Sequence, residues 1–354
     1  MLGAAALGLS GLLAGCAAPA RSRQGQARPA SPNALSGPAG APVPALKPGA
    51  RIAIVAPASG SPVAADEAVQ WLLDRGYEPV PMPATRLRME APYDFLGGPD
   101  EARLDDLHDA FRAPDIGAVW CLQGGFGSWR LLAGLDGALI AANPKPFIGY
   151  SDITALHLAI QARAGFVTFH GPMLAQDLLA GKAEPTESLA FAMLTGAVGA
   201  GSWIVPPPEF APRALAGGRA TGRLVGGNLA LISALMGTPY EIDTRDAILF
   251  IEDVNEHPAR IDRMLAQLRA AGKLDGVKGV LLGNFTRLGL RMPDEEAQAL
   301  IEPLLMANLR DLGVPVLGAW PSGHGDPNLI LPLGARVTLD TAQGGLQLEQ
   351  AVVR

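Results

Sequence analysis

The sequence predicts an α/β protein built from two domains. From residue 50 onward, apolar runs of strand length alternate with amphipathic runs of helical periodicity. The apolar runs are continuous, which is typical of parallel strands buried on both faces of a sheet. With 354 residues, of which 49% are hydrophobic and 18% charged, the chain is long and apolar enough for two cores of ordinary size.

The first domain is predicted to span residues 49–185. Its first strand is expected at residues 51–57, followed by a helix at residues 63–75. Further strands are expected at residues 118–122, 146–150 and 166–169. This order of strands and helices favours a parallel sheet.

An interdomain connection is predicted over residues 186–219, and the second α/β domain over residues 220–354. Weak periodicity and four prolines indicate the connection: Pro206, Pro207, Pro208 and Pro212. In the second domain a strand is expected at residues 247–251. A helix is expected at residues 258–271, with Pro258 at its first position and Gly272 as its stop.

That helix carries an apolar stripe with the spacing i, i+3, i+4 and i+7. Its members are Ile261, Met264, Leu265 and Leu268. Such spacing indicates a face packed on the core rather than contacts to a cofactor.

The first sixteen residues are an apolar run of small side chains that ends in Leu13, Ala14, Gly15 and Cys16. This ending resembles a bacterial lipoprotein cleavage box, in which Cys16 becomes the lipidated first residue. Residues 17–48, rich in Ala, Pro, Gly and Ser, are then a flexible linker. The sequence predicts an exported protein, periplasmic or anchored to the membrane. No positive charge precedes the run, so a cytoplasmic protein with a different start, or an ordinary cleaved signal, remains the alternative.

Charge and cysteine content exclude several classes of partner. The net charge is −6, the isoelectric point is about 5.4, and no block of Lys or Arg occurs, so nucleic acid is not expected as a partner. Cys16 and Cys121 cannot form a disulfide framework, and neither belongs to a cluster with metal-ligand spacing. We therefore expect no metal and no other cofactor.

Ser151 lies between an expected strand and an expected helix. A serine in this position resembles a nucleophile elbow, where the turn exposes the hydroxyl and helix N–H groups stabilise an oxyanion. The match to G-x-S-x-G is partial, because Gly149 and Ser151 fit but Ile153 stands in the place of the second glycine. Spacing alone leaves a second interpretation open, in which Ser151 is only a helix N-cap.

Other polar residues follow strands as well. Glu252 and Asp253 come directly after a buried strand, so either could orient a histidine, or both could be acids near a helix start. His324 lies between two glycines, which suits an uncrowded histidine that transfers protons near neutral pH. A structural loop histidine is the alternative. His257 is expected to be a capping or solvent residue, and among the remaining histidines only His170 could line a cleft.

The turn from Gln123 to Arg130 holds Gly124, Gly125 and Gly127 after a strand. It lacks the lysine of a phosphate-binding loop and the spacing of a dinucleotide site. An amide that lines an anion hole, or a plain tight turn, remains possible at this point.

Together these segments resemble the LD-carboxypeptidase family, also called muramoyltetrapeptide carboxypeptidases, from about Arg51 to Ala335. The resemblance rests on motifs in order: IVAP at 54–57, GGFG at 124–127, GYSDIT at 149–154, GGNL at 226–229, Gly-Thr-Pro at 237–239, ED at 252–253, RIDR at 260–263 and Gly-His at 323–324. It implies a Rossmann-like or flavodoxin-like parallel-sheet domain, a C-terminal swivelling β/α domain, and an active site at their interface.

The resemblance also implies the chemistry. Ser151 would be the nucleophile, His324 the general base and Glu252 its partner, with the backbone N–H groups of Gly125 and Asp152 as oxyanion donors. The reaction would be hydrolysis of the L-D peptide bond in muropeptide tetrapeptide stems, with release of terminal D-alanine. Gln123 departs from the family, where arginine is expected before the glycines.

Two alternatives accompany this prediction. One is an immunity peptidase of the same family that cleaves a peptidyl-nucleotide antibiotic with the same three residues. The other is a non-catalytic binding lipoprotein. The expected partner is a muropeptide or a peptidoglycan stem peptide, membrane contact is expected only through the N-terminal anchor, and a homodimer is expected.

Overall fold

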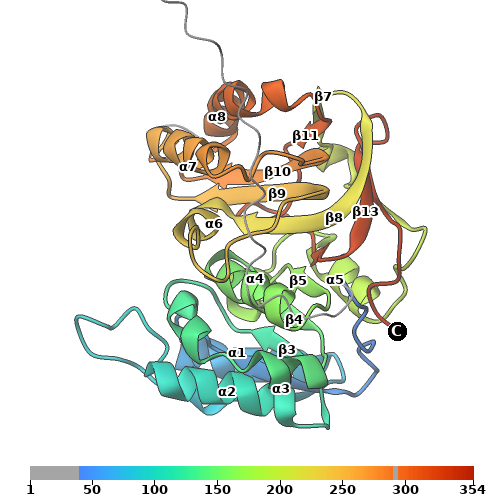
Figure 1. Cartoon of the computed structure of the whole chain (residues 1–354). Coiled ribbons are helices and arrows are strands. Elements are labelled where there is room, and N and C mark those ends of the chain that lie inside the picture. The colour runs from blue at the N-terminus through green and yellow to red at the C-terminus, as the bar shows by residue number, and fades with distance from the viewer. Residues whose placement is uncertain (1–39, 290–293) are drawn as a thin grey trace, which may run out of the picture. The chain divides into compact units, whose positions relative to one another are not determined.

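A computed structural model describes residues 40–289 and 294–354, and its strands form two sheets (Figure 1). The strands of the first sheet are β1 (Arg51–Val55), β2 (Glu78–Pro81), β3 (Ile116–Cys121), β4 (Phe147–Gly149), β5 (Thr168–His170) and β12 (Leu331–Leu333), in the spatial order β12-β5-β4-β3-β1-β2. β1 to β5 are parallel, and β12 is antiparallel to β5. The order of the five parallel strands is that of a flavodoxin-like sheet, as the resemblance implied.

The second sheet is mixed and has eight strands. They are β6 (Trp203–Ile204), β7 (Arg213–Ala216), β8 (Arg219–Asn228), β9 (Ala247–Val254), β10 (Gly279–Thr286), β11 (Val316–Gly318), β13 (Arg336–Asp340) and β14 (Gly345–Leu348), in the order β6-β14-β13-β8-β9-β10-β11-β7. β8, β9, β10 and β11 form its parallel centre. The prediction of a two-domain α/β fold is confirmed.

The helices lie between the strands along the chain. They are α1 (Pro62–Asp74), α2 (Asp100–Arg112), α3 (Gly137–Ala142), α4 (Thr154–Arg163), α5 (Thr186–Leu194), α6 (Leu229–Ala234), α7 (Pro258–Ala270) and α8 (Asp294–Leu309). α6 packs on β8 and β9, α8 packs on β10, and α7 lies between α6 and α8 (Figure 1). None of the helices within the described residues is long and apolar enough to cross a membrane.

Helix α7 shows how closely the local pattern determines the structure. Its buried residues are the four of the predicted stripe: Ile261, Met264, Leu265 and Leu268. Pro258 occupies the first turn, and Gly272 follows the helix with φ +70°, a conformation that glycine adopts without strain. The predicted helix and its role in the core are confirmed.

Residues 186–219 contain more regular structure than the predicted connection. α5 lies in this segment, and β6 and β7 form the two opposite edges of the second sheet. The prolines that indicated irregular structure lie between these elements, at Pro206–Pro208 and Pro212. Proline lacks the N–H that a central strand needs, so it interrupts the segment without preventing short edge strands on either side.

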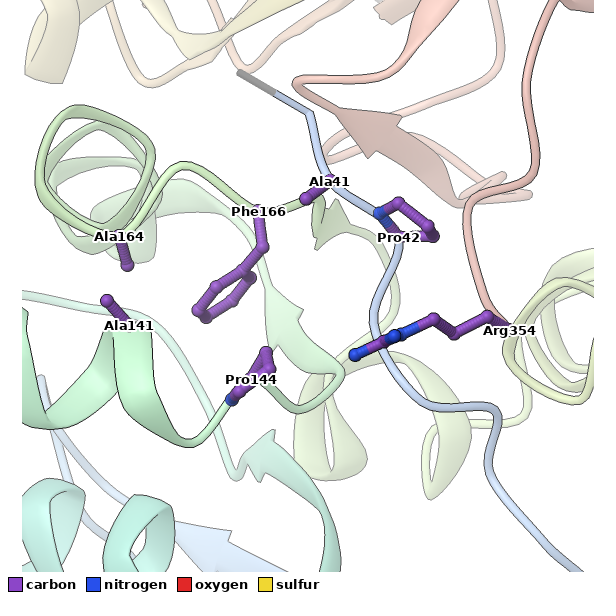
Figure 2. A pocket seen from close by; sticks show the side chains of 7 residues that line it. All are labelled: Ala41, Pro42, Ala141, Pro144, Ala164, Phe166 and Arg354. Atoms are coloured by element: carbon purple, nitrogen blue, oxygen red, sulfur yellow. The ribbon is translucent and has the colours of Figure 1, made fainter. Parts of the chain in front are cut away.

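The predicted linker to residue 48 is wrong for its last part. Val43 bridges Val353, Ala41 bridges Phe166, and the side chains of Val43 and Leu46 are buried. Burial of these apolar side chains fixes residues 41–46 against the folded chain. The segment also lines a cavity of about 230 Å³, where Ala41 and Pro42 meet Ala141, Pro144, Ala164, Phe166 and Arg354 (Figure 2).

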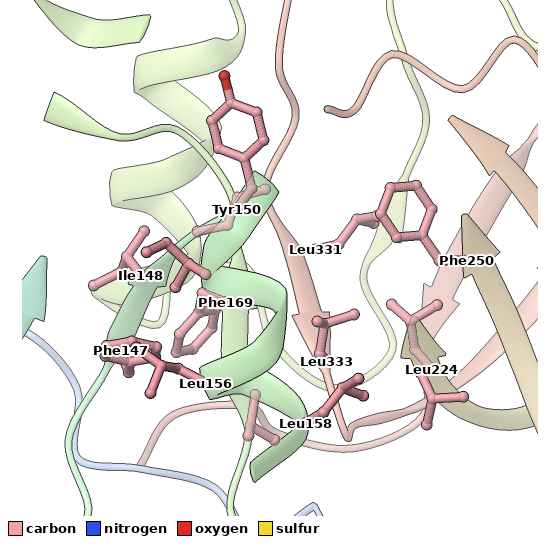
Figure 3. Packing of buried hydrophobic residues seen from close by; sticks show 14 of the residues in the cluster. Phe147, Ile148, Tyr150, Leu156, Leu158, Phe169, Leu224, Phe250, Leu331 and Leu333 are labelled. Atoms are coloured by element: carbon pink, nitrogen blue, oxygen red, sulfur yellow. The ribbon is translucent and has the colours of Figure 1, made fainter. Parts of the chain in front are cut away.

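One hydrophobic core extends through both sheets. Figure 3 shows Phe147 and Phe169 of the first sheet on one side and Leu224 and Phe250 of the second sheet on the other, with Leu331 and Leu333 between them. In the sequence β12 lies between β11 and β13 of the second sheet, but it completes the first sheet. This packing fixes the carboxyl ends of β4 and β9 on a shared core.

Candidate active site

Ser151 lies on a strained turn at the carboxyl end of β4. The chain passes there into the short 3-10 turn η3 (Ser151–Ile153) and then into α4. The φ angle of Ser151 is +63°, which non-glycine residues rarely adopt and which persists only where the surroundings impose it. Gly149 permits the turn, because a Cβ at that position would lie 3.0 Å from Ile153 and 3.1 Å from Cys121. The hydroxyl is thus exposed at the carboxyl ends of the parallel strands, as in a nucleophile elbow.

The interpretation of Ser151 as a helix N-cap is wrong. No side-chain hydrogen bond caps the start of η3 or of α4. The Ser151 hydroxyl lies instead 3.0 Å from Nε2 of His324.

The three residues Ser151, His324 and Glu252 form one chain of hydrogen bonds. Nδ1 of His324 lies 2.6 Å from Oε2 of Glu252, and Nε2 faces Ser151. A carboxylate can only accept, so Nδ1 carries the proton and Nε2 is left to accept from the serine hydroxyl. The structure therefore brings together residues that are far apart in the sequence, in the geometry that an imidazole base requires.

Glu252 is fully buried at the end of β9, while the His324 side chain is 16% exposed. The second carboxylate oxygen of Glu252, Oε1, has no hydrogen-bond partner among the described residues. A buried carboxylate with so few donors depends strongly on the partner it has. The negative charge of Glu252 is thus directed at the imidazole.

The glycines beside His324 serve close packing, which corrects the expectation of an uncrowded histidine. Gly323 has φ +108°, and a Cβ there would lie 2.5 Å from Oε2 of Glu252. A Cβ on Gly325 would lie 2.4 Å from the side chain of Asn284. Both positions need glycine because the loop is pressed against neighbouring side chains. The loop is held, and His324 is held with it.

Asp253 has a different environment from Glu252. Its carboxylate accepts from Asn228 Nδ2 at 3.0 Å, from the Ala230 N–H at 2.9 Å and from the Val254 N–H at 2.7 Å. Burial and the neighbouring charge of Glu252 raise the pKa of Asp253 to about 7, whereas the three donors act in the opposite direction. Asp253 therefore supports the start of α6. The alternative that Glu252 and Asp253 are acids at the start of α7 is wrong. His257 caps that helix, as predicted, by accepting from the Ala259 N–H at 3.2 Å.

The glycine-rich turn lies against the nucleophile. A Cβ on Gly124 would lie 3.1 Å from the Ser151 Cβ and 3.3 Å from its Oγ, which is tighter than an ordinary contact, so glycine eases this close approach. Asp152 ties the elbow to the same turn: its buried carboxylate accepts from the Ser128 N–H at 2.7 Å, and burial raises its pKa. The backbone of Gly125, at φ +112°, lies in this turn, and its role as an oxyanion donor with Asp152 stays a prediction.

Exposed aromatic rings stand beside the turn. Phe126 is 65% exposed, and the ring of Phe95 lies 6.1 Å from it. Tyr93 extends the group. Ser59 joins the two segments, because its hydroxyl donates to the Phe95 carbonyl at 2.5 Å and accepts from the Phe126 N–H at 3.4 Å. Such an exposed apolar group is typical of a contact surface for a ligand or partner.

His170 does not line a cleft, contrary to the prediction. It is completely buried between Tyr150 and Phe250, and neither ring nitrogen has a partner among the described residues. Burial lowers its pKa well below the usual value, so the ring is neutral. His170 is a core residue behind the site.

No metal site accompanies these residues. Within residues 40–289 and 294–354, no group of three or more His, Cys, Asp or Glu side chains is arranged to hold an ion. The cavity of Figure 2 shares no residue with Ser151 and its partners.

Three polar residues near the site were not singled out in the sequence. Asp177, Lys182 and Asn328 bond to the segments that carry Ser151 and His324. Asn328 lies only four positions after His324, but no local pattern marks Asp177 or Lys182.

Comparison with known proteins places this site in a family. Family models for the LD-carboxypeptidase N-terminal and C-terminal domains match residues 52–171 and 221–339. A probable murein peptide carboxypeptidase of Bacillus subtilis is 38% identical over 87% of this chain and 94% of its own length. The murein tetrapeptide carboxypeptidase of Pseudomonas aeruginosa is 36% identical over 82% and 93%.

Solved structures agree with these matches. The muramoyltetrapeptide carboxypeptidase from Oxalobacter formigenes has a TM-score of 0.70 and 31% identity, over 84% of this chain and 97% of that one. The microcin C7 self immunity protein MccF has a TM-score of 0.74 and 26% identity, over 88% and 99%. Fold and site thus define a two-domain α/β peptidase. The chain belongs to the LD-carboxypeptidase family.

Proposed function

We propose that this protein is a serine-type LD-carboxypeptidase that releases terminal D-alanine from the tetrapeptide stems of muropeptides. The observation that carries the proposal is the hydrogen-bond chain from Ser151 through His324 to Glu252. The names of the Bacillus and Pseudomonas relatives support the substrate class.

The first half of the reaction forms an acyl-enzyme. Ser151 Oγ attacks the carbonyl carbon of the L-D bond while Nε2 of His324 takes the hydroxyl proton. Glu252 stabilises the imidazolium that results, through the bond at Nδ1. Backbone N–H groups of Gly125 and Asp152 are the proposed donors to the oxyanion. His324 then gives its proton to the leaving nitrogen, and D-alanine departs.

The second half returns the enzyme to its starting state. A water molecule loses its proton to Nε2 of His324 and attacks the ester carbonyl. The bond to Ser151 Oγ breaks, His324 returns the proton to that oxygen, and the shortened stem peptide leaves with a free carboxylate. Every proton is carried by one imidazole, so the site needs only the groups already described.

The direct test is product analysis. Purified protein incubated with a muramoyl tetrapeptide should release free D-alanine and leave a tripeptide stem, as measured by mass spectrometry. A tetrapeptide that ends in L-alanine is the matched control and should remain intact. Release of an internal fragment, or no release of D-alanine at all, would contradict the proposed reaction.

A second candidate is an immunity peptidase of the MccF kind. It is supported by the structural similarity to MccF, of which one structure is described in complex with aspartyl sulfamoyl adenosine, and by the exposed rings of Phe95 and Phe126. Aromatic rings of this kind can stack on a base. Identity of 36–38% with carboxypeptidases against 26% with MccF favours the first candidate. Parallel assays with a muropeptide and with an aminoacyl sulfamoyl adenosine separate the two.

We also propose that the protein is exported and anchored through Cys16, which lies outside the described residues. The support is the Leu13 to Cys16 sequence and the linker-like composition that follows. Full-length protein should sediment with membranes, and Cys16→Ala should move it to the soluble fraction. Unchanged membrane attachment of Cys16→Ala would argue against the lipid anchor.

A further inference from the structure

Asp177 joins the nucleophile segment to the residues behind it. It lies fully buried in η4 (Leu174–Leu178), a single turn of π-helix. Its carboxylate accepts from the Tyr150 hydroxyl at 3.2 Å and from the Met173 N–H at 2.9 Å. Tyr150 directly precedes Ser151, so the hydrogen bond to Asp177 helps to hold the turn that carries the nucleophile. Single π-turns are rare and often found at functional sites.

The same carboxylate also reaches the loop that carries His324. Asn328 donates from Nδ2 to Asp177 at 3.2 Å and accepts from the Gly323 N–H at 2.9 Å. Lys182 pairs with Asp177 at 2.6 Å and donates to the Gly325 carbonyl at 2.7 Å. The residues on both sides of His324 are thus fixed by groups that converge on one buried carboxylate.

Among these residues, Lys182 contacts both the loop of His324 and the ring of Tyr150. Its ammonium group lies 5.8 Å from the centre of the Tyr150 ring, and that ring lies 4.9 Å from the ring of His324. The Lys182 side chain is 14% exposed and Asp177 is not exposed, so the contact is largely shielded from water. A lysine in this position fixes backbone and ring neighbours of the base without touching it.

We propose that Lys182 is a positioning residue, which holds His324 in reach of Ser151 through the Gly325 carbonyl and the pair with Asp177. This inference rests on the proposed function of the Ser151 site. Lys182 would maintain the distance of 3.0 Å between His324 Nε2 and Ser151 Oγ. Misplacement of a catalytic group by about 1 Å can lower a rate by roughly 10²-fold.

The chain contains a matched control for the loss of a shielded lysine. Lys273 donates to the Ile242 carbonyl at 2.7 Å and pairs with Glu241 at 3.2 Å, and its side chain is 15% exposed. This arrangement resembles that of Lys182 but lies outside the site. Removing one partner of a shielded pair destabilises a protein wherever it occurs. Lys273→Met therefore measures the effect of stability alone.

The experiment compares Lys182→Met, Lys182→Arg and Lys273→Met in the full-length protein. Lys182→Met should lower kcat by about 10- to 100-fold with KM near the wild-type value, because the base is displaced but the substrate surface is not. Lys182→Arg, which keeps a charged donor, should restore most of kcat. Lys273→Met should melt at a lower temperature and retain kcat.

Three results would overturn the inference: kcat of Lys182→Met within twofold of wild type, an equal loss of kcat in Lys273→Met, or no recovery in Lys182→Arg. If Lys182→Met does not fold, Lys182→Gln is judged by the same criteria, since it keeps a polar side chain at this position but removes the charge. The labelling rate of Ser151 by a fluorophosphonate is read in parallel. It depends on His324 but on no peptide substrate, so a wrong substrate class and a wrong role of Lys182 give different results.

Discussion

Replacing Ser151 with alanine is expected to abolish release of D-alanine and to leave the protein folded. Loss of the nucleophile in a serine triad lowers kcat by roughly 10⁶-fold, because no other group forms the acyl intermediate. Folding should survive because the hydroxyl caps no helix and its hydrogen bond is to His324. Circular dichroism and a D-alanine assay on the same preparation measure both outcomes.

The other serines near the site provide the controls. Ser59 donates to the Phe95 carbonyl, Ser128 to the Asp152 carbonyl and Ser322 to the Leu329 carbonyl, so each hydroxyl has a structural partner. Their alanine variants should lose some stability but keep the chemistry. Turnover in Ser151→Ala together with its loss in one of these three would move the nucleophile elsewhere.

Ser151→Gly adds a test of the strained turn. Glycine adopts φ +63° without strain, whereas the strain of a non-glycine residue costs about 1–3 kcal/mol. The glycine variant should be as inactive as the alanine variant but more resistant to thermal unfolding. A glycine variant no more stable than the alanine variant would show that Ser151 stores no strain.

The second large effect is expected for Glu252→Gln. Loss of the orienting charge should lower kcat by about 10³–10⁴-fold, or about 4–5.5 kcal/mol of barrier, with KM little changed. The amide keeps the shape but removes the charge that stabilises the imidazolium. Steady-state kinetics of D-alanine release measure the loss.

Asp253→Asn is the neighbouring control. The new amide N–H group would face at least one of the three N–H groups from which Asp253 now accepts a hydrogen bond. Because two donors cannot bond to each other, the variant should lose about 1–3 kcal/mol of unfolding free energy. Its kcat should stay within about tenfold of wild type, because Asp253 makes no contact with His324. Near-normal turnover in Glu252→Gln beside a collapse in Asp253→Asn would give the orienting role to Asp253.

The sequence predicted what local patterns determine. The stripe of α7 follows from periodicity, because side chains at fixed spacing share a face whatever surrounds them, and the strand before Ser151 follows from a continuous apolar run. Spacing left Ser151 open between a cap and a nucleophile, and the family motifs decided for the nucleophile. The hydrogen bond between Ser151 and His324, and the lack of a capping bond at η3 and α4, exclude the cap.

What the sequence did not reveal depends on contacts between distant segments. Lys182 and Asp177 carry no local signal, because their importance comes from Gly325 and Tyr150, which the fold brings beside them. The same holds for Val43, whose burial depends on pairing with Val353 near the other end of the chain. The glycines on either side of His324 suggest a flexible loop from the sequence alone. Their close approach to Glu252 and Asn284 becomes visible only in the fold.

The antiparallel pairing of β12 with β5 limits how members of this family can exchange their halves. Leu331 pairs with His170 and Leu333 with Thr168, so a strand encoded late in the sequence closes the edge of a sheet encoded early. A recombinant that joins the first half of one relative to the second half of another must keep these two strands complementary. Otherwise the unpaired backbone of β5 is left as a template for another chain, which favours aggregation. The two parts of the chain matched by separate family models can therefore be exchanged between relatives less freely than those separate matches suggest.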